Sequence, residues 1–76
     1  MKMEIQEKIR LLRENAGLKQ KDMAELLKTT QQYYSEYELG NRRIPSDHIK
    51  TLCEYFHVSA DYLLGLPEGL PYPKRK

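Results

Sequence analysis

The sequence predicts an all-α fold, a compact bundle of five short helices. Apolar residues recur at helical spacing in five successive segments, whereas strand-like alternation and Val/Ile-rich runs are absent. A chain of 76 residues leaves room for one domain with a small core. We therefore expect short helices packed around a single core.

The first segment is amphipathic. Ile5, Ile9, Leu12 and Ala16 fall on one helical face, with charged residues mostly between them. This spacing predicts a helix of about three turns. Gly17 is expected to end it, because glycine suits the backbone that follows a helix C-terminus.

The second and third segments are separated by residues 28–30. The second helix is expected to end near residue 28, and Thr30 is a suitable N-cap for the third. Gly40 is expected to end the third helix. The residues that should face inward from these two helices are Met23, Ala24, Leu27, Tyr34 and Tyr37.

Two short helices complete the predicted bundle. Pro45 cannot continue a helix and favours an extended Ile44, so residues 41–45 form a loop. Ser46 is then expected to cap a fourth helix, and Ser59 a short fifth one over residues 60–64. The apolar face of the fourth helix comprises Ile49, Leu52, Cys53 and Phe56. We expect a domain over residues 1–66 and a flexible, basic, Pro-rich tail over 67–76.

Composition excludes several classes of protein. The single cysteine rules out a disulfide framework and a multi-thiolate metal site, and His48 and His57 have no partner cysteines. We therefore expect no metal and no cofactor. No nucleophile elbow or phosphate loop is present, so we expect no enzyme activity. No apolar run is long enough to span a membrane and no export signal is visible, so we expect a cytoplasmic protein without membrane contact.

Net charge alone does not predict nucleic-acid binding. Thirteen Lys and Arg against eleven Asp and Glu give +2, but Lys74, Arg75 and Lys76 lie in the tail. Without them ten basic residues face eleven acidic ones, and the body carries −1. The distribution of charge matters more than the sum.

Residues 20–39 carry the functional signal. Two helices of about eight residues each are joined by a three-residue turn, and the small Ala24 permits a close, steep crossing. This arrangement is typical of a helix-turn-helix, whose second helix lies in the DNA major groove. The outward face of that helix would then present Gln31, Gln32, Tyr33, Ser35 and Glu36.

From residue 8 to residue 65, about three quarters of the chain, the sequence resembles the Cro/C1-type (Xre-like) helix-turn-helix family. The resemblance rests on the order and spacing of Leu18-Lys19-Gln20, Met23-Ala24-Glu25-Leu26-Leu27, Tyr34-Ser35-Glu36-Tyr37-Glu38-Leu39-Gly40, Ile44-Pro45-Ser46 and Val58-Ser59-Ala60-Asp61-Tyr62-Leu63-Leu64-Gly65. It implies a lambda-repressor-like five-helix bundle that binds double-stranded DNA.

The start of the third helix resembles the recognition helix of lambdoid phage repressors, on Thr29-Thr30-Gln31-Gln32. A glutamine amide can form two hydrogen bonds with adenine at once. The resemblance implies that Gln31 reads an adenine and Gln32 a neighbouring base. It also implies that Gln20 bonds a phosphate and braces Gln31.

The resemblance assigns two further roles. It places Arg42 and Arg43 in a loop along the phosphates, and it pairs Arg13 with Glu38 in an ion pair that orients the third helix. Lys19 and Lys28 are additional candidates for phosphate contact.

Three features depart from the family pattern. Lys28 stands where glycine is frequent, which costs about 1 kcal/mol if φ is positive. Lys19 replaces a Ser or Thr cap worth roughly 1 kcal/mol. Tyr33 and Glu36 differ from the lambdoid pattern, and Glu36 would repel phosphate unless it accepts from a cytosine amine. The operator sequence therefore does not transfer.

Each assignment has a simpler alternative. The glutamines and loop arginines are also compatible with ordinary solvated positions, and Arg13 and Glu38 with unrelated surface charges. Among the tyrosines, Tyr33 is the candidate for facing DNA, while Tyr34, Tyr37 and Tyr55 or Tyr62 are expected in the core and a subunit interface. Cys53 is expected to be an inert core residue.

The sequence predicts a sequence-specific transcriptional regulator, a repressor that binds a pseudo-palindromic operator as a homodimer without a small-molecule ligand. The resemblance implies a dimer contact at Ala60 and Tyr62. The alternative is a protein-interaction module, such as an antitoxin that masks a partner toxin. The body charge of −1 and Glu36 favour this alternative, whereas Gln20, Gln31 and Gln32 favour DNA.

Overall fold

The computed structural model describes residues 3–66 and confirms the all-α prediction, since this range contains helices and no strand. The helices are α1 (Ile5–Asn15), α2 (Gln20–Leu27), α3 (Gln31–Leu39), α4 (Ser46–Phe56) and α5 (Ala60–Leu64). None of these helices combines the length and apolarity that a membrane crossing requires. The tail predicted for residues 67–76 lies outside the described residues.

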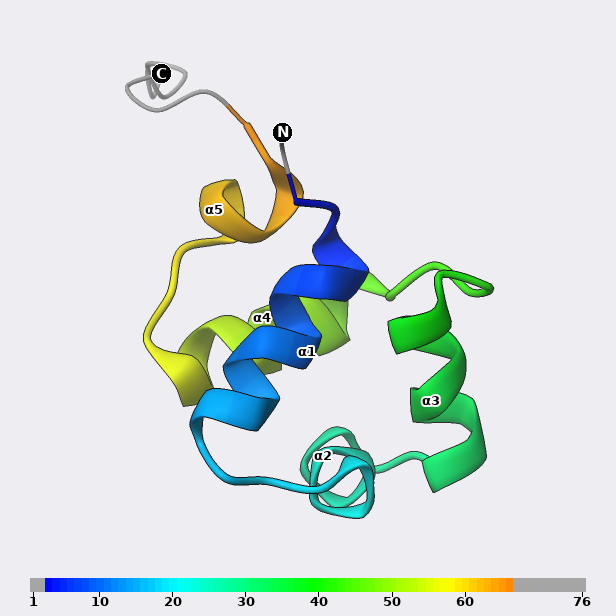
Figure 1. Cartoon of the computed structure of the whole chain (residues 1–76). Helices are drawn as coiled ribbons and strands as arrows, with labels where there is room; N and C mark the ends of the chain where they lie inside the picture. Colours follow the sequence, from blue (N-terminus) through cyan, green and yellow to red (C-terminus); the bar gives the residue numbers. More distant parts are fainter. Residues whose placement is uncertain (1–2, 67–76) are drawn as a thin grey trace.

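The helices surround one core. Helix α1 runs through the middle of the bundle and packs against α3 and α5, while α4 packs against α5 and α2 (Figure 1). In this view α2 is seen nearly along its axis and α3 lies across the line of sight, so the two helices cross steeply (Figure 1). This crossing places α3 at the edge of the molecule, with one long side free.

Every helix contributes to the core, whose buried residues are Ile9, Met23, Ala24, Leu27, Tyr34, Tyr37, Leu52 and Leu63. All five inward-facing residues predicted for α2 and α3 are among them. Complete burial of one large apolar side chain stabilises the fold by about 1.5–3 kcal/mol. Ala16 is the exception on the predicted face of α1, because it follows the helix as its C-cap and is exposed.

Two of the three predicted N-caps are confirmed. The hydroxyl of Thr30 accepts from the Tyr33 amide at 3.0 Å, and that of Ser59 accepts from the Tyr62 amide at 3.1 Å. The prediction for Ser46 is wrong, because Pro45 occupies the N-cap position with φ −61° and ψ 154°. Ser46 is already helical there, so its hydroxyl cannot take the capping position.

Helix α2 begins without a capping oxygen at Lys19, as predicted. Instead, the Lys19 amide donates to the carboxylate of Asp22 at 2.8 Å. This is one half of a capping box, in which the third helical residue satisfies the amide that precedes the helix. The carboxylate also lies at the positive end of the helix dipole.

Two helices end in a left-handed residue that is not glycine. Lys28 follows α2 and His57 follows α4, and both have φ 57°. Lys28 therefore has the positive φ for which the sequence predicts a cost. Because a side chain makes this conformation unfavourable by about 1 kcal/mol, both positions store a small amount of strain.

Candidate nucleic-acid interface

The pair of helices α2 and α3 has the local geometry of a helix-turn-helix. The left-handed Lys28 ends α2, the Thr29 amide donates to the Ala24 carbonyl at 2.9 Å, and the Thr30 cap starts α3. Ala24 is 3% exposed, as a close crossing requires. The turn is therefore held by backbone hydrogen bonds at one end and by a side-chain cap at the other.

The outward side of α3 carries the polar residues predicted to read bases. Gln31, Gln32 and Tyr33 are exposed, and Ser35 and Glu36 are half-buried. The Ser35 hydroxyl donates to the Gln32 carbonyl at 2.9 Å. Within residues 3–66 neither glutamine amide has a hydrogen-bond partner, so the donors and acceptors of both are unused by this part of the chain.

Glu38 lies on the other side of α3 and confirms the predicted ion pair with Arg13. The Arg13 Nε atom lies 2.7 Å from Oε2 of Glu38 and Nη2 lies 3.1 Å from Oε1, so the contact is two-pronged. A third donor, Nη1 of Arg13, bonds the Leu18 carbonyl at 3.0 Å. One guanidinium thus connects α1, α3 and the segment that leads into α2.

Two more donors converge on the same carboxylate. The Tyr34 hydroxyl donates to Oε2 of Glu38, and the Gln20 amide donates to Oε1 at 3.0 Å. Burial would raise the pKa of Glu38, but the hydrogen bonds from Arg13, Tyr34 and Gln20 outweigh it and hold that pKa below its usual range. The hydrogen bond with Glu38 raises the pKa of Arg13, and burial raises the pKa of Tyr34 well above that of a free tyrosine.

The predicted bracing of Gln31 by Gln20 is not found, and the predicted phosphate contact of Gln20 stays a prediction. Its amide nitrogen donates to Glu38 at 3.0 Å, and within residues 3–66 no hydrogen bond joins it to Gln31. The reason is electrostatic: a buried carboxylate attracts an amide donor more strongly than a neutral side chain does. Gln20 therefore ties α2 to α3 from behind the reading face.

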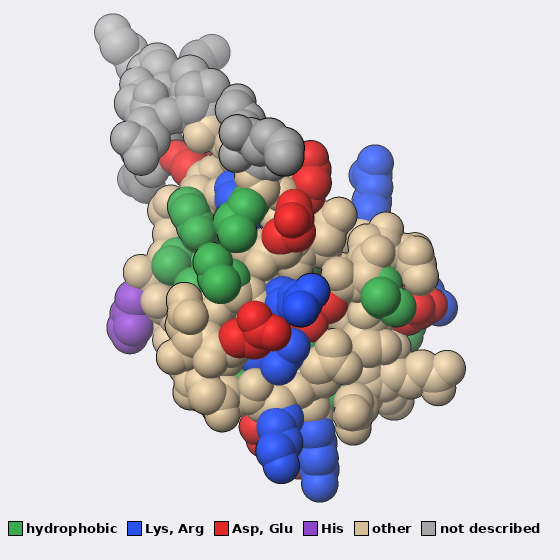
Figure 2. Space-filling view, in the orientation of Figure 1, with side chains coloured by type: hydrophobic (Ala, Val, Ile, Leu, Met, Phe, Trp, Pro, Cys, Tyr) green, Lys and Arg blue, Asp and Glu red, His purple; other side chains and the backbone are tan. Residues whose placement is uncertain are grey.

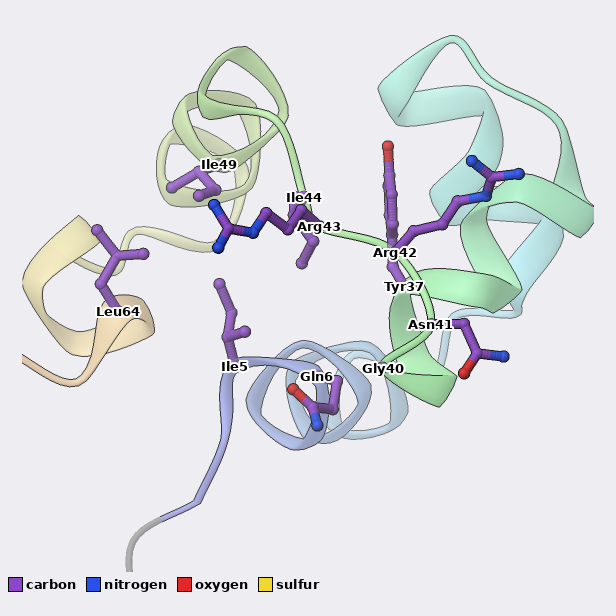
Figure 3. Close-up of a pocket in the computed structure, with 10 residues that line it drawn as sticks. All are labelled: Ile5, Gln6, Tyr37, Gly40, Asn41, Arg42, Arg43, Ile44, Ile49 and Leu64. Atoms are coloured by element: carbon purple, nitrogen blue, oxygen red, sulfur yellow. The ribbon is translucent and has the colours of Figure 1, made fainter.

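The loop between α3 and α4 carries two neighbouring arginines with different surroundings. The Arg42 guanidinium carbon lies 4.2 Å from the centre of the Tyr33 ring, a cation–π contact. Both arginines border an open groove between α1, this loop, α4 and α5. Arg43 extends over Ile44 toward Ile49, whereas Arg42 extends in the opposite direction, toward the side of α3 (Figure 3).

The two lysines predicted to contact phosphate flank α2. Lys19 precedes the helix, Lys28 follows it, and both side chains are exposed. Figure 2 shows Lys and Arg side chains protruding at the end of the molecule where Figure 1 places α2. Lys19 and Lys28 therefore offer exposed positive charge at this end of the molecule, next to the acidic Asp22 and Glu25 of α2.

The residues predicted for a dimer contact lie on α5. Ala60 is exposed and Tyr62 is 45% exposed, whereas Tyr55 on α4 is 49% exposed instead of filling the core. The Lys8 ammonium lies 4.7 Å from the Tyr62 ring centre and donates to the Tyr62 carbonyl. The short helix is thus attached to α1 while its outer side stays accessible.

Sequence reasoning missed several contacts around α3. The bond between Tyr34 and Glu38 joins residues four apart on one helix, a spacing that makes such a contact predictable. The contact of Tyr33 with Arg42 and the bond from Asn41 to Glu36 at 3.3 Å depend on how the loop folds back. No sequence pattern signals those two contacts.

Comparison with known proteins agrees with this geometry. A family described as "Helix-turn-helix domain" matches residues 6–69. The HTH-type transcriptional regulator ImmR of Bacillus subtilis (strain 168) is 35% identical over 66 residues, which are 87% of this chain and 52% of ImmR. An uncharacterized HTH-type transcriptional regulator from the same organism, YobD, is 32% identical over 68 residues, which are 90% of this chain and 60% of YobD. The chain thus spans between about half and three fifths of the length of these curated relatives.

A solved structure shares the fold. The crystal structure of a transcriptional regulator from Listeria innocua superposes with a TM-score of 0.81 at 26% identity, covering 96% of this chain and 68% of that one. Helix-turn-helix transcriptional regulators of this family are not enzymes. The sequence match, the relatives and the shared fold converge: the chain belongs to the Xre-like helix-turn-helix family of transcriptional regulators.

Proposed function

We propose that this protein binds double-stranded DNA at a specific sequence and represses transcription by occupying an operator. One observation carries the proposal: Gln31 and Gln32 stand exposed at the start of α3, with both amides unused by the rest of the described chain. The N-terminal residues of a recognition helix are those that reach base edges. Glutamine there suits adenine, whose N6 and N7 atoms match the two ends of the amide.

The cluster around Glu38 supports the same function by holding α3 in one orientation. A side-chain amide can distinguish one base from another only if the position of its helix is fixed to well within the length of a hydrogen bond. Arg13 from α1 and Gln20 from α2 both bond the carboxylate on α3, so three helices define where the reading face lies. Lys19 and Lys28 at the two ends of α2, and Arg43 in the loop after α3, supply exposed positive charge for phosphates.

A homodimer on a pseudo-palindromic operator completes the proposal. One α3 helix of nine residues covers only a few base pairs, so two copies are needed for a selective site. Two-fold symmetry would set the half-sites about 34 Å apart. The exposed side of α5, with Ala60 and Tyr62, is the proposed contact between the copies.

The test is fluorescence anisotropy with duplex DNA from upstream of the gene, compared with a scrambled duplex. Tight binding to the native duplex alone is expected, and Gln31→Ala and Gln32→Ala should each weaken it by roughly 1–3 kcal/mol. Lys50→Ala, an exposed position on α4, is the matched control and should have no such effect. Equal, steeply salt-dependent binding to both duplexes would show phosphate attraction only and contradict the proposal.

The alternative function is a protein-interaction module that masks a partner. One observation favours it: Leu39 at the end of α3 is 68% exposed, an apolar contact available to a protein. Under this alternative Leu39→Lys abolishes binding to the product of a neighbouring gene and leaves DNA affinity unchanged. A pull-down with that product and the anisotropy experiment separate the two functions.

A further inference from the structure

We propose that Arg42 and Glu36 together read one G·C base pair, and that Tyr33 is the residue that positions Arg42. The inference rests on the proposed DNA binding and adds to it a base identity that the two glutamines do not supply. A small hollow lies on the exposed side of α3. The hollow is lined by Thr30, Gln32, Tyr33, Glu36 and Arg42. The loop arginine thus shares a surface with the proposed base-reading side chains.

The surroundings of Arg42 leave its donors available. The guanidinium carbon sits 4.2 Å from the Tyr33 ring centre, and within residues 3–66 no carboxylate lies close enough to form an ion pair with it. A guanidinium held against an aromatic face keeps its edge free, and that edge carries the N–H groups that form two parallel hydrogen bonds. Arg43 has a different position, because it extends over Ile44 away from α3 (Figure 3).

Tyr33 is itself supported by the core. Its ring meets the ring of Tyr37 edge-on, with centroids 5.7 Å apart and planes at 90°. Tyr37 is 1% exposed, and its hydroxyl lies 3.0 Å from Nδ1 of His48 on α4. The stack from Arg42 through Tyr33 therefore ends on a residue that cannot move without disturbing the core. Such support reduces the entropy lost when Arg42 binds a base.

Glu36 supplies the complementary group. The Asn41 amide donates to its Oε2 atom at 3.3 Å, which restrains the carboxylate and leaves Oε1 available. A carboxylate accepts hydrogen bonds and donates none. The guanidinium of Arg42 and this carboxylate line the same hollow without forming an ion pair, so within residues 3–66 neither charge is neutralised by the other.

Base chemistry selects that partner. In the major groove guanine presents two acceptors, O6 and N7, and cytosine presents one donor, N4. Arg42 matches the guanine edge and Glu36 matches the cytosine amine. An A·T pair would instead place the acceptor O4 of thymine before the Glu36 carboxylate. The same pairing also explains how an acidic residue is tolerated on a surface that faces DNA.

The test begins with selection of bound sequences from a randomised duplex pool by the full chain. Each G·C pair in the enriched sequence is then replaced by A·T. In a separate set of duplexes, the guanine of each pair is replaced by 7-deazaguanine, which lacks the N7 acceptor. At one position the wild-type protein should lose about five- to 150-fold in affinity on replacement by A·T. Arg42→Ala should lose most of the preference for the G·C duplex and keep only the smaller part that Glu36 contributes.

Matched variants separate base reading from a simple charge effect. Tyr33→Phe keeps the ring and should keep the G·C preference, whereas Tyr33→Leu should lose it. Glu36→Ala should reduce the preference without abolishing it, because Arg42 still contacts guanine, and should bind a scrambled duplex more tightly, because a negative charge is removed. Arg43→Ala should weaken all duplexes alike and keep the preference.

The outcomes distinguish this inference from the proposed function. If Arg42→Ala weakens every duplex by the same factor, as Arg43→Ala should, Arg42 contacts phosphate and the inference fails while sequence-specific binding stands. Enrichment of a sequence without any Arg42-dependent G·C pair also overturns it. If the wild-type protein enriches no sequence at all, the proposed function itself fails.

Discussion

Arg13 and Glu38 lie 25 residues apart in the chain and form a two-pronged ion pair, with Nε 2.7 Å from Oε2 and Nη2 3.1 Å from Oε1. The side chains are only 14% and 5% exposed. The pair connects the first helix to the end of the helix that presents the reading face. Because Gln20 and Tyr34 donate to the same carboxylate, three side chains donate hydrogen bonds to the one charge of Glu38.

Removing that charge should destabilise the whole domain. Glu38→Gln removes the buried counter-charge of Arg13 and leaves only the more exposed Glu14 carboxylate, 3.9 Å away, so we expect the free energy of unfolding to fall by about 3 kcal/mol. Urea denaturation followed by circular dichroism measures the change. The control is Arg10→Gln, because the pair of Arg10 with Glu14 has side chains 63% and 48% exposed and its loss should change stability by less than about 0.5 kcal/mol. Equal losses in the two variants would show that burial of the pair does not matter.

The same carboxylate should make stability depend on pH. Folding lowers the pKa of Glu38 below its ordinary value of 4.5, because hydrogen bonds outweigh the effect of burial. The unfolded chain therefore binds this proton more tightly than the folded one. The stabilisation is fully present above about pH 4.5 and is lost as pH falls through the lower folded pKa.

Unfolding curves between neutral pH and about pH 2 test this prediction. The difference in stability between the wild-type protein and Glu38→Gln should be largest near neutral pH and shrink in acid. If the free energies of unfolding of the two proteins differ by the same amount at every pH, Glu38 does not contribute to the pH dependence.

The left-handed residues Lys28 and His57 allow the effect of backbone strain on stability to be separated from an effect on DNA binding. Lys28 and His57 have the same φ of 57°, so glycine at either position should raise the free energy of unfolding by about 0.5–1 kcal/mol. Only Lys28→Gly should also weaken DNA binding, since Lys28 is the proposed phosphate contact. For Lys28→Gly, the slope of log affinity against log salt concentration should become less negative by about 0.9. If His57→Gly weakens DNA binding equally, the effect is not due to loss of the Lys28 charge.

The proposed dimer contact predicts different behaviour for two exposed tyrosines. Tyr62→Asp should raise the dimer dissociation constant at least about tenfold, because a buried interface charge is costly. Lys8 lies beside this position and can pair with the new carboxylate, so α5 should stay attached to α1. Tyr55→Asp, at a similarly exposed position on α4, should leave association unchanged. Sedimentation equilibrium measures both, and a wild-type protein that is monomeric both free and on DNA would refute the contact.

The sequence alone determined where the helices lie and which faces they bury. Helical spacing of Met23, Ala24 and Leu27, the Thr30 cap and the glycine at residue 40 act within a few residues, so local chemistry suffices to predict them. The prediction that Ser46 caps α4 was wrong for a local reason too. Pro45 and Ser46 compete for one position, and the extended backbone of Pro45 decided the outcome.

The tertiary structure decided how side chains from different helices are used. Resemblance predicted that Arg13 meets Glu38, but only the fold shows that Gln20 bonds the same carboxylate and not Gln31. The sequence likewise cannot distinguish Arg42 from Arg43, which are adjacent and chemically identical. The path of the loop turns one toward Tyr33 and the other toward the far side of the domain, because neighbouring residues in an irregular segment point in directions set by the backbone dihedrals.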